Sequence, residues 1–293
     1  MNVQLSVLVT RQNARDPVDE CLRSLINQAS IGEIILLDGV GDDYHPPADA
    51  RVRVMRFEAP ASLPMLLATG IVEARGDIVA MTESHCQAAP DWAANVIAEH
   101  ERTHQPVIGG VVEAGAGLGY VDFGLYVADY GAFMPPIRDG EADEMPGENV
   151  SFKREIFTPH LETIARDGFY KTLFCQDVQS AGKSLICANS IVMYYQRRIG
   201  LGALARRRFT HGRCFGAQLA KRLTPAVRWA RVGGDLLLPA VLMIRLMRKT
   251  LPKRAHTPRV IAALPVVLLA TVSWAAGEWI GNLFGAGDSC RYV

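Results

Sequence analysis

A carboxylate and an imidazole stand close together at the end of an apolar run of the sequence. Residues 78–82 read IVAMT and are apolar enough to form a buried β-strand, and Glu83 and His85 follow directly. Ligands of an open parallel α/β sheet bind outside the carboxyl ends of its strands. An acid and an imidazole at that place can share a divalent cation, and such a cation would bind a phosphate-bearing substrate.

A second carboxylate ends an earlier apolar run. Residues 33–39 read EIILLDG, which predicts a strand that ends at Asp38 and is followed by a glycine. Each of these two strands follows a helix-forming segment, so the pair indicates a nucleotide-binding α/β domain. Asp38 can equally cap the turn that follows it, and both interpretations stay open at this point.

Strands and helices alternate along the first part of the chain. Asp16 and Pro17 supply a cap and a first-turn proline for the first helix. The alternation predicts a mainly parallel sheet with right-handed crossovers. Aromatic residues at 120–133 predict a helix packed on this sheet, with a sugar-binding platform as the alternative. The predicted helices are 16–29, 63–74, 91–102, 153–157 and 170–182, and the predicted strands are 5–9, 33–37, 52–57, 78–82, 106–112, 149–152 and one or two within 184–195.

Charge is strongly segregated, although the net charge of the 293 residues is only +1. Residues 1–196 carry 14 Lys and Arg against 27 Asp and Glu, whereas residues 197–259 carry 16 against the single acid Asp235. We therefore expect an acidic globular domain at 1–196, a basic connector at 197–231 and apolar helices at 232–293. The basic segment lacks interleaved aromatic residues and adjoins apolar helices, which favours an anionic membrane surface over nucleic acid.

The apolar C-terminal part predicts membrane attachment. Residues 232–247 form a short helix with Asp235 and Arg245, suited to an interfacial or re-entrant position. Residues 260–277 are uncharged and long enough to cross a membrane once. Basic residues flank the first helix, and the positive-inside rule places them in the cytoplasm. The alternative is a hairpin of both helices packed on the globular body.

The spacing of the cysteines indicates a reducing compartment, and the first residues do not resemble a signal peptide. The six cysteines show no C-x-x-C spacing, which argues against a zinc site or a disulfide framework. Residues 1–10 are too short and strand-like for a signal peptide. We therefore expect a protein of the inner or cytoplasmic membrane with its globular domain on the cytoplasmic side.

The motifs, taken in order, resemble glycosyltransferase family 2 with the GT-A fold. The resemblance covers residues 3–284, and a membrane-associated branch of the family carries Thr-Glu-Asp-His-Cys where this chain reads TESHC. It implies a GT-A type, mainly parallel α/β sheet flanked by helices, followed by C-terminal amphipathic and membrane-associated helices. The matching segments are SVLVTRQN (6–13), DECLRSLINQ (19–28), IILLDG (34–39), TESHC (82–86), GENVSFKR (147–154), RRFTHGR (207–213) and WAAGEWIG (274–281).

The resemblance implies roles in binding a nucleoside-diphosphate-sugar donor. Asp38 would contact the nucleobase, and Thr10 would line the same pocket. Glu83 and His85 correspond to the family's diphosphate and metal motif, which holds Mn²⁺ or Mg²⁺ to neutralise the leaving diphosphate. The family usually has a carboxylate in place of His85, and an imidazole favours Mn²⁺ over Mg²⁺. The alternative is that His85 only fills the end of the strand.

The position of the catalytic base differs from the pattern of inverting members. In those proteins an acid lies about eleven residues before the glycine that ends its helix. Counting back from Gly182 gives Lys171, and a lysine cannot act as this base unless it is strongly desolvated. Asp177 and Glu148 are the remaining candidates, with a preference for Asp177. A catalytically impaired homologue that binds sugar nucleotides or acts as a scaffold subunit is the second hypothesis.

Arg207 and Arg208 lie in a basic segment, Arg206–Arg213, that in similar proteins lies at the membrane interface and holds diphosphate or lipid phosphate. The alternative is a solvated basic face neutralised by anionic lipid. Thr210 and His211 stand where many processive members have Arg-Trp, which favours transfer of one sugar. The expected activity is therefore transfer of a single sugar to a lipid-linked or glycan acceptor, in cell-surface polysaccharide or glycolipid synthesis.

Overall fold

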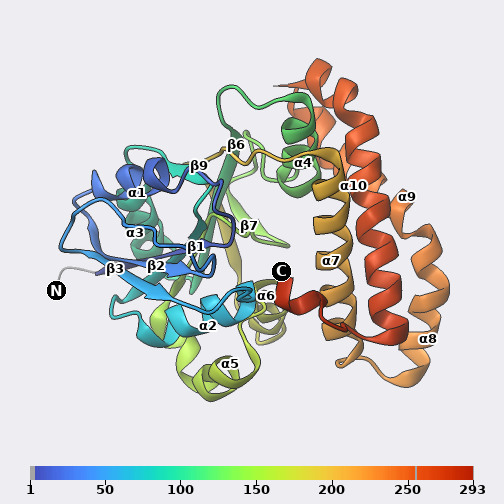
Figure 1. The fold of residues 1–293 in the computed structure, drawn as a ribbon, viewed down its shortest axis with the longest axis horizontal. Helices are drawn as coiled ribbons and strands as arrows, with labels where there is room; N and C mark the ends of the chain where they lie inside the picture. Colours follow the sequence, from blue (N-terminus) through green and yellow to red (C-terminus); the bar gives the residue numbers. More distant parts are fainter. Residues whose placement is uncertain (1–3, 255, 293) are drawn as a thin grey trace. The chain divides into compact units, whose positions relative to one another are not determined.

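A computed structural model describes residues 4–254 and 256–292 of the chain. The chain divides into two compact units, each built from two segments. Unit 1 comprises Met1–Ala116 and Pro135–Arg197, and unit 2 comprises Gly117–Met134 and Arg198–Val293. Figure 1 shows a sheet flanked by helices in the first unit and long helices in the second.

Unit 1 is built on one sheet, whose nine described strands follow the order β3-β2-β1-β4-β8-β6-β9-β5, with β7 paired to β9. β1 to β4 form a parallel half, and β8 runs antiparallel to both β4 and β6. The expected α/β class is confirmed, and the sheet is mixed, because β5 and β7 also run antiparallel to β9. The strands are β1 Leu5–Arg11, β2 Ile31–Asp38, β3 Val52–Arg56, β4 Ile78–Glu83, β5 Cys86–Ala88, β6 Val107–Ala114, β7 Gly140–Ala142, β8 Val150–Lys153 and β9 Leu185–Tyr195.

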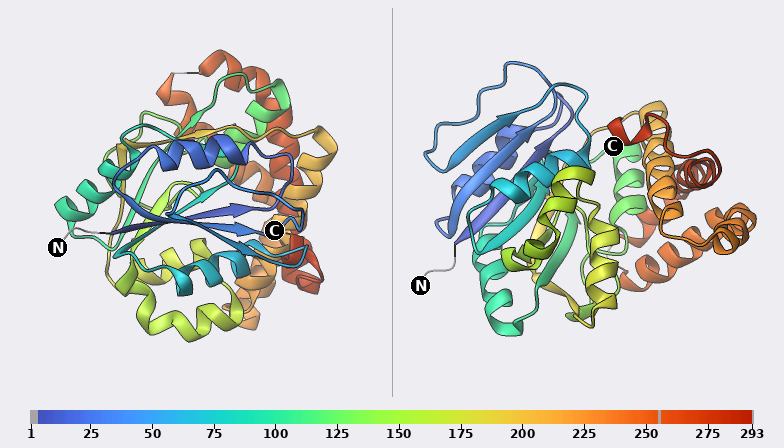
Figure 2. Two further views of the ribbon diagram at one scale, coloured as in Figure 1. Left: turned by 60° about the vertical axis from the view of Figure 1, so that its left-hand side comes forward. Right: turned by 90° about the horizontal axis from the view of Figure 1, so that it is seen from below.

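Helices cover both faces of this sheet (Figure 2). Every residue of β1 is buried, as is typical of a parallel strand covered on both sides. β3 is only partly buried, which agrees with its expected place at the edge of the sheet. The helices of unit 1 are α1 Val18–Ile26, α2 Leu63–Glu73, α3 Trp92–Thr103, α5 Leu161–Asp167 and α6 Lys171–Ser180, with a 3₁₀ segment at Arg154–His160.

Unit 2 is helical. The aromatic segment forms the expected helix α4, but its buried Leu125 packs with Val266 and Ala270 of α10, a partner the sequence did not predict. α7 contains Arg206, Arg207, Arg208 and Arg213 of the basic segment, which were expected to lie on a helix. The helices of unit 2 are α4 Tyr120–Tyr130, α7 Leu201–Ala220, α8 Pro225–Gly234, α9 Leu238–Thr250 and α10 Thr257–Phe284, with 3₁₀ segments at Asp235–Leu237, Leu251–Lys253 and Ser289–Tyr292.

α7 and α10 touch backbone to backbone. A Cβ atom on Gly212 would lie 2.1 Å from the carbonyl oxygen of Trp274, and one on Gly277 would lie 2.1 Å from that of Phe209. No side chain fits in either place, so the two helices approach as closely as small-residue helix pairs do. Four glycines line the contact, two on each helix and four residues apart: Gly212, Gly216, Gly277 and Gly281.

The C-terminal segments differ from the expectation in one respect. The predicted single helix at 232–247 is wrong, because α8 ends at Gly234, a 3₁₀ turn follows and α9 starts anew at Leu238. Pro239 stands in the first turn of α9, where a proline favours a new helix start over continuation of the old one. Asp235 in the turn is buried and accepts a hydrogen bond from Asn282 Nδ2 at 2.7 Å.

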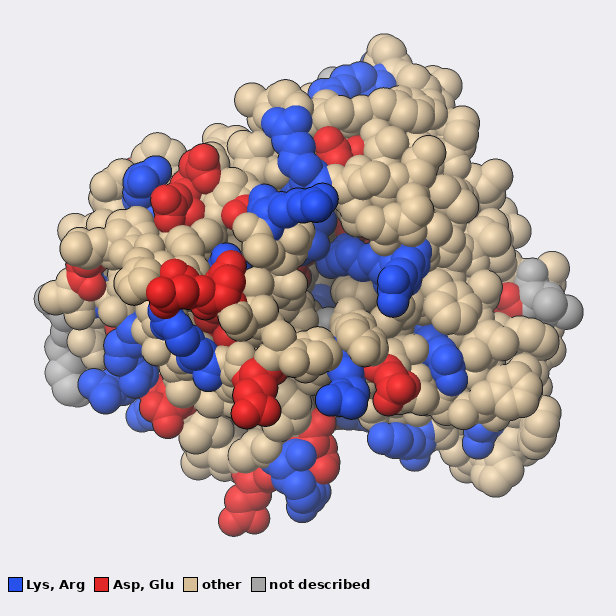
Figure 3. All heavy atoms as spheres, in the orientation of Figure 1, with Lys and Arg blue, Asp and Glu red and all other residues tan. Residues whose placement is uncertain are grey.

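α10 is the one helix in the described part of the chain that is long and apolar enough to cross a membrane. It has 28 residues, and its most apolar 18-residue window has a mean hydropathy of 2.1 and is 44% buried within the protein. Its carboxylate Glu278 is buried and paired, since Arg231 Nη2 lies 2.5 Å from Oε1 and Trp274 Nε1 lies 2.9 Å from Oε2. Broad uncharged areas cover the helices of unit 2 in Figure 3.

One pair of cysteines contradicts the expectation of no disulfide. Cys214 of α7 and Cys290 are bonded, although 76 residues separate them. Their spacing in the sequence gives no sign of the contact between α7 and the last 3₁₀ segment. The other four cysteines are free and buried: Cys21, Cys86, Cys175 and Cys187.

Candidate active site

The carboxyl ends of three parallel strands place the predicted binding residues along one edge of the sheet. β1 lies between β2 and β4, and its register pairs Arg11 with Asp38 and Thr10 with Glu83. Neighbouring strands lie about 4.8 Å apart, so the backbones of Asp38 and Glu83 are separated by roughly 10 Å. Thr10, Asp38 and Glu83 therefore lie at one edge, as the sequence predicted.

Glu83, His85 and Glu148 form a compact group of potential metal ligands. One ligand atom from each lies within 4.8 Å of the other two. His85 Nδ1 is 3.5 Å from Glu83 Oε2, and His85 Nε2 is 3.8 Å from Glu148 Oε1. His85 and Glu148 are buried, while the side chain of Glu83 keeps 13% of its surface exposed. Sequence reasoning treated Glu148 only as a base, because the loop before β8 gives no sign that it reaches His85.

Asp16 is a further carboxylate beside this group. Its Oδ2 lies 3.8 Å from His85 Nδ1 and accepts a hydrogen bond from Ser84 Oγ at 2.8 Å. Asn13 Nδ2 donates to its other oxygen at 3.0 Å. The expected capping role of Asp16 is wrong, because α1 starts at Val18 and the side chain of Asp16 is used by the site instead.

Arg197 balances these acids, and sequence reasoning missed it. Its Nη2 donates to Glu83 Oε2 at 2.7 Å and lies 2.8 Å from His85 Nδ1. Burial acts to lower the pKa of Arg197, but the negative charges of Glu83 and Asp16 raise it more, so the pKa lies above its ordinary value. The guanidinium therefore stays charged. The one available signal was its place two residues after the end of β9 at Tyr195, whose ring also meets the His85 ring edge-on.

Asp38 is buried and paired with Arg11. Arg11 Nη1 lies 3.0 Å from Asp38 Oδ1, and the same guanidinium binds both oxygens of Asp42 at 2.5 and 2.7 Å. The hydrogen bond with Asp42 raises the pKa of Arg11, burial lowers it, and the negative charge of Asp38 raises it further. The pKa of Arg11 therefore lies above its ordinary value. Asp38 Oδ1 also accepts the N–H of Val40 at 3.2 Å, so it caps the following turn as its alternative interpretation predicted.

Other predicted residues have simpler surroundings. Thr10 is buried, and its Oγ1 lies 3.5 Å from the carbonyl oxygen of Thr82. Asp177 is exposed on α6 and is not one of the three grouped ligands. Lys171, at the start of the same helix, donates from Nζ to the carbonyl oxygen of Met145. The two candidate bases therefore differ in setting, Glu148 being buried beside His85 and Asp177 being exposed.

Arg207 and Arg208 lie on α7 and share one carboxylate of unit 2. Arg207 Nη1 is 3.2 Å from Asp129 Oδ2, and Arg208 Nη1 bonds to Asp129 Oδ1. The Arg208 guanidinium also stands over the ring of Trp274, 4.6 Å from its centroid. The side chains of Arg207 and Arg208 keep 19% and 12% of their surfaces exposed.

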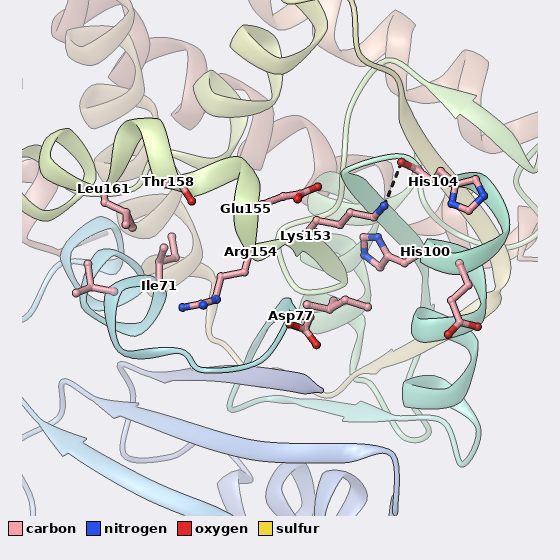
Figure 4. Close-up of a pocket in the computed structure, with 12 residues that line it drawn as sticks. Ile71, Asp77, His100, His104, Lys153, Arg154, Glu155, Thr158 and Leu161 are labelled. Atoms are coloured by element: carbon pink, nitrogen blue, oxygen red, sulfur yellow. Dashed lines mark hydrogen bonds between the residues drawn. The ribbon is translucent and has the colours of Figure 1, made fainter. Parts of the chain in front are cut away.

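A cavity of about 590 Å³ in unit 1 lies at the opposite end of β4 from Glu83. Asp77 precedes β4 and Lys153 ends the antiparallel β8, so both mark the amino end of β4 (Figure 4). Figure 4 shows Lys153 Nζ bonded to the carbonyl oxygen of His104, at a distance of 3.2 Å. This cavity and the strand-end carboxylates are therefore separate features of the unit.

A sheet of this order, with carboxylates and an imidazole at the carboxyl ends of its parallel strands, has the architecture of a GT-A glycosyltransferase. The family model described as glycosyl transferase family 2 matches residues 6–157, more than half of the chain. The chain belongs to glycosyl transferase family 2.

Two solved structures support the fold assignment. The mannosyltransferase PcManGT from Pyrobaculum calidifontis, in complex with GDP-Man and Mn²⁺, is 16% identical with a TM-score of 0.57, over 97% of this chain and 88% of that chain. S. aureus TarS 1–349 in complex with UDP-GlcNAc is 13% identical with a TM-score of 0.51, over 98% of this chain and 89% of that chain. At these identities the likeness shows the fold. No curated protein matches the sequence.

The donor set at the strand ends fits a divalent cation. Two carboxylates and one imidazole combine oxygen and nitrogen ligands, and their atoms lie close enough together for one ion to reach all three. Mn²⁺ accepts such a mixed set, whereas Mg²⁺ prefers oxygen.

Proposed function

We propose that the chain is an inverting glycosyltransferase that moves a single sugar from a nucleoside-diphosphate sugar to a lipid-linked or glycan acceptor. The acceptor would lie at the cytoplasmic face of the inner or cytoplasmic membrane, in cell-surface polysaccharide or glycolipid synthesis. The observation that carries this proposal is the common strand edge that brings Asp38 together with Glu83, His85 and Glu148.

Each residue of this edge has a proposed role. Asp38 and Thr10 bind the nucleoside, and Asp38 shares its carboxylate with Arg11. Glu83 and His85 would hold Mn²⁺ or Mg²⁺, a Lewis acid that stabilises the charge of the leaving diphosphate. Glu83 is the partly exposed member, so it is the one that a donor can approach from solvent.

Transfer needs one carboxylate to take a proton. The acceptor hydroxyl loses its proton to this base, its oxygen bonds to the anomeric carbon, and the bond from that carbon to the diphosphate breaks with inversion. Glu148 and Asp177 are the proposed bases. Replacement of each by alanine tests them, because loss of the true base is expected to lower kcat by about 10²–10⁴-fold. For Glu148, which also lies among the potential cation ligands, an unchanged Mn²⁺ affinity of the variant would separate loss of a base from loss of a ligand. Unchanged activity in both variants would remove both candidates.

Membrane attachment is supported by unit 2. α10 is long and apolar, and Trp229 of α8 and Ile244 of α9 keep 67% and 53% of their surfaces exposed. Basic residues between α8 and α10 favour an anionic leaflet, and the positive-inside rule favours the cytoplasmic side. Flotation of the full chain with vesicles containing phosphatidylglycerol tests this, and equal recovery with and without vesicles would contradict it.

Arg207 and Arg208 are proposed to contact the donor diphosphate or a lipid phosphate. Both are bound to Asp129, so a phosphate would have to share them with that carboxylate. An Arg207→Ala variant is expected to raise the donor KM or to weaken binding to anionic vesicles, and the comparison of these two measurements identifies which phosphate is bound.

The overall proposal is tested with the purified chain in detergent. GDP-mannose and UDP-GlcNAc are suitable first donors, because PcManGT is solved with GDP-Man and TarS with UDP-GlcNAc. Calorimetry with Mn²⁺ or Mg²⁺ should detect donor binding, and release of nucleoside diphosphate should accompany transfer. No binding of any common nucleotide sugar would overturn the proposal.

The second candidate function is a sugar-nucleotide-binding or scaffold subunit without transfer activity. It is favoured by Lys171, which stands where inverting relatives carry the base and whose ammonium is bonded to Met145. Donor binding without any nucleoside diphosphate release, in the presence of varied acceptors, would support it.

A further inference from the structure

Arg197 already uses the atoms of Glu83 and His85 that a cation would need. Its Nη2 lies 2.7 Å from Glu83 Oε2 and 2.8 Å from His85 Nδ1. A guanidinium has only donors, so Nδ1 must accept, and the neutral imidazole therefore carries its proton on Nε2. Nε2 then directs this proton toward Glu148 Oε1, 3.8 Å away.

This arrangement prevents His85 from binding a cation through either nitrogen while Arg197 stays in place. Coordination through Nδ1 requires the lone pair that Arg197 uses. Coordination through Nε2 moves the imidazole proton to Nδ1, where it would face the N–H of Arg197 at 2.8 Å. The guanidinium of Arg197 is not deprotonated in proteins, so its positive charge also repels any cation at that distance.

We propose that Arg197 and the divalent cation compete for Glu83 Oε2 and His85 Nδ1, and that the donor diphosphate relieves this competition by binding the Arg197 guanidinium. Arg197 is then a donor-binding residue that also makes cation binding depend on the donor. The inference rests on the proposed function, since it needs a diphosphate-bearing donor.

Charge balance explains why the exchange requires both ligands. Arg197 offsets Glu83, to which it donates at 2.7 Å, and the carboxylates of Asp16 and Glu148 each lie 3.8 Å from a ring nitrogen of His85. Its departure alone would leave buried carboxylates unpaired, which is strongly unfavourable, and entry of a cation at the same time restores the balance. The planar guanidinium matches two phosphate oxygens, so a diphosphate is a suitable new partner.

The test is a Mn²⁺ titration of the purified full chain by calorimetry, with and without GDP or UDP. In the wild type, we expect Mn²⁺ to bind weakly alone and about tenfold more tightly with nucleotide, a typical coupling between sites. An Arg197→Ala variant should bind Mn²⁺ alone about tenfold more tightly than the wild type, and nucleotide should add little. Its donor KM should rise, because the guanidinium partner of the diphosphate is gone.

Matched variants separate the change in Mn²⁺ affinity caused by removing Arg197 from the effects of losing any positive charge or of unfolding. Arg198→Ala removes the neighbouring, exposed arginine and should leave Mn²⁺ affinity unchanged. Arg197→Lys keeps the charge without the fork geometry and should give intermediate Mn²⁺ affinity, and circular dichroism establishes that each variant is folded. Equal Mn²⁺ affinity in wild type and both Arg197 variants overturns the inference. Failure of the proposed function is distinct, since the wild type would then bind no donor.

Discussion

Units 1 and 2 differ in where their charged and large apolar side chains lie. Unit 1 buries a polar cluster that includes Asp38, Glu148 and Arg197, and unit 2 buries fewer charged side chains, such as the paired Glu278. Unit 2 exposes large apolar groups: of those that are exposed in the described chain, all but Met65, Val72, Leu161 and Tyr194 lie in unit 2.

The contrast separates two physical costs. A buried charge is tolerated where a partner and a chemical task exist, because an unpaired one is strongly unfavourable. An exposed apolar patch is tolerated where a partner or a lipid phase covers it. The single chain therefore combines a unit that buries a charged cluster with a unit that exposes many large apolar side chains, and four experiments probe that division.

The largest expected effect is the loss of transfer in a Glu83→Gln variant. The change removes the charge of a proposed cation ligand and weakens the pair with Arg197, so kcat should fall by about 10²–10³-fold. Vesicle binding should be unaffected, because the membrane contact proposed above involves unit 2 and Glu83 lies in unit 1. Glu58→Gln, at an exposed position of unit 1, is the control and should retain full activity in a donor-hydrolysis assay.

The buried histidine His100 should make unit 1 sensitive to acid. Burial lowers the pKa of His100 to about 4 from its ordinary value of 6.5. The folded state then binds fewer protons than the unfolded state between these values, so its contribution to stability is complete above pH 6.5 and is lost as pH falls toward 4. The loss is on the order of 3 kcal/mol.

Urea unfolding of a His100→Gln variant at several pH values measures this contribution. The difference in unfolding free energy between wild type and variant should narrow from pH 7 to pH 4. His45→Gln, whose side chain is 77% exposed, is the control for the loss of an imidazole from the surface of unit 1. A difference for His100→Gln that stays constant with pH would show that this buried histidine does not couple folding to protons.

The backbone contact of α7 with α10 should make unit 2 intolerant of one added methyl group. A Cβ on Gly212 would lie 2.1 Å from a backbone oxygen, so Gly212→Ala should destabilise the protein by about 1–3 kcal/mol. Gly202→Ala, on the same helix with nothing within 4 Å, should instead stabilise it by up to about 1 kcal/mol. Thermal unfolding in detergent compares the two, and equal shifts would contradict the close contact.

The smallest expected effect is at the outward face of α10. Ile261, Leu268 and Val272 are 54%, 50% and 45% exposed, and each Ser substitution should weaken vesicle binding by about 1 kcal/mol. Val72→Ser, at a similarly exposed position of unit 1, should not change vesicle recovery. If all four variants float alike, the division between the units would not extend to membrane binding.

The sequence predicted the features that neighbouring residues encode. Apolar runs that end in Asp38 and Glu83 gave both the strands and the common edge, because parallel strands place their carboxyl ends together. The strands β5 and β7 were missed, because three residues are too few to show the alternation of buried and exposed side chains that identifies a strand. The break between α8 and α9 was missed because overall apolar character outweighed the local signal of Pro239.

The remaining parts of the site depend on contacts between distant residues. Arg197 contacts His85, although 112 positions of sequence separate them. In the sequence, Arg197 looks like one more arginine of the basic segment that follows it. Glu148 reaches His85 only because β8 inserts beside β4. The pairing of Cys214 with Cys290 likewise follows from the folding of α7 against the chain end. No spacing rule connects such residues.

The glycine contact between α7 and α10 has a practical use. Because peptide groups, and not large side chains, form that contact, the outward residues of α10 are free to change without loosening the helix pair. Charged replacements at Ile261, Leu268 and Val272, with Gly277 and Gly281 retained, should therefore reduce the exposed apolar surface of α10 while the packing of α7 against α10 stays unchanged.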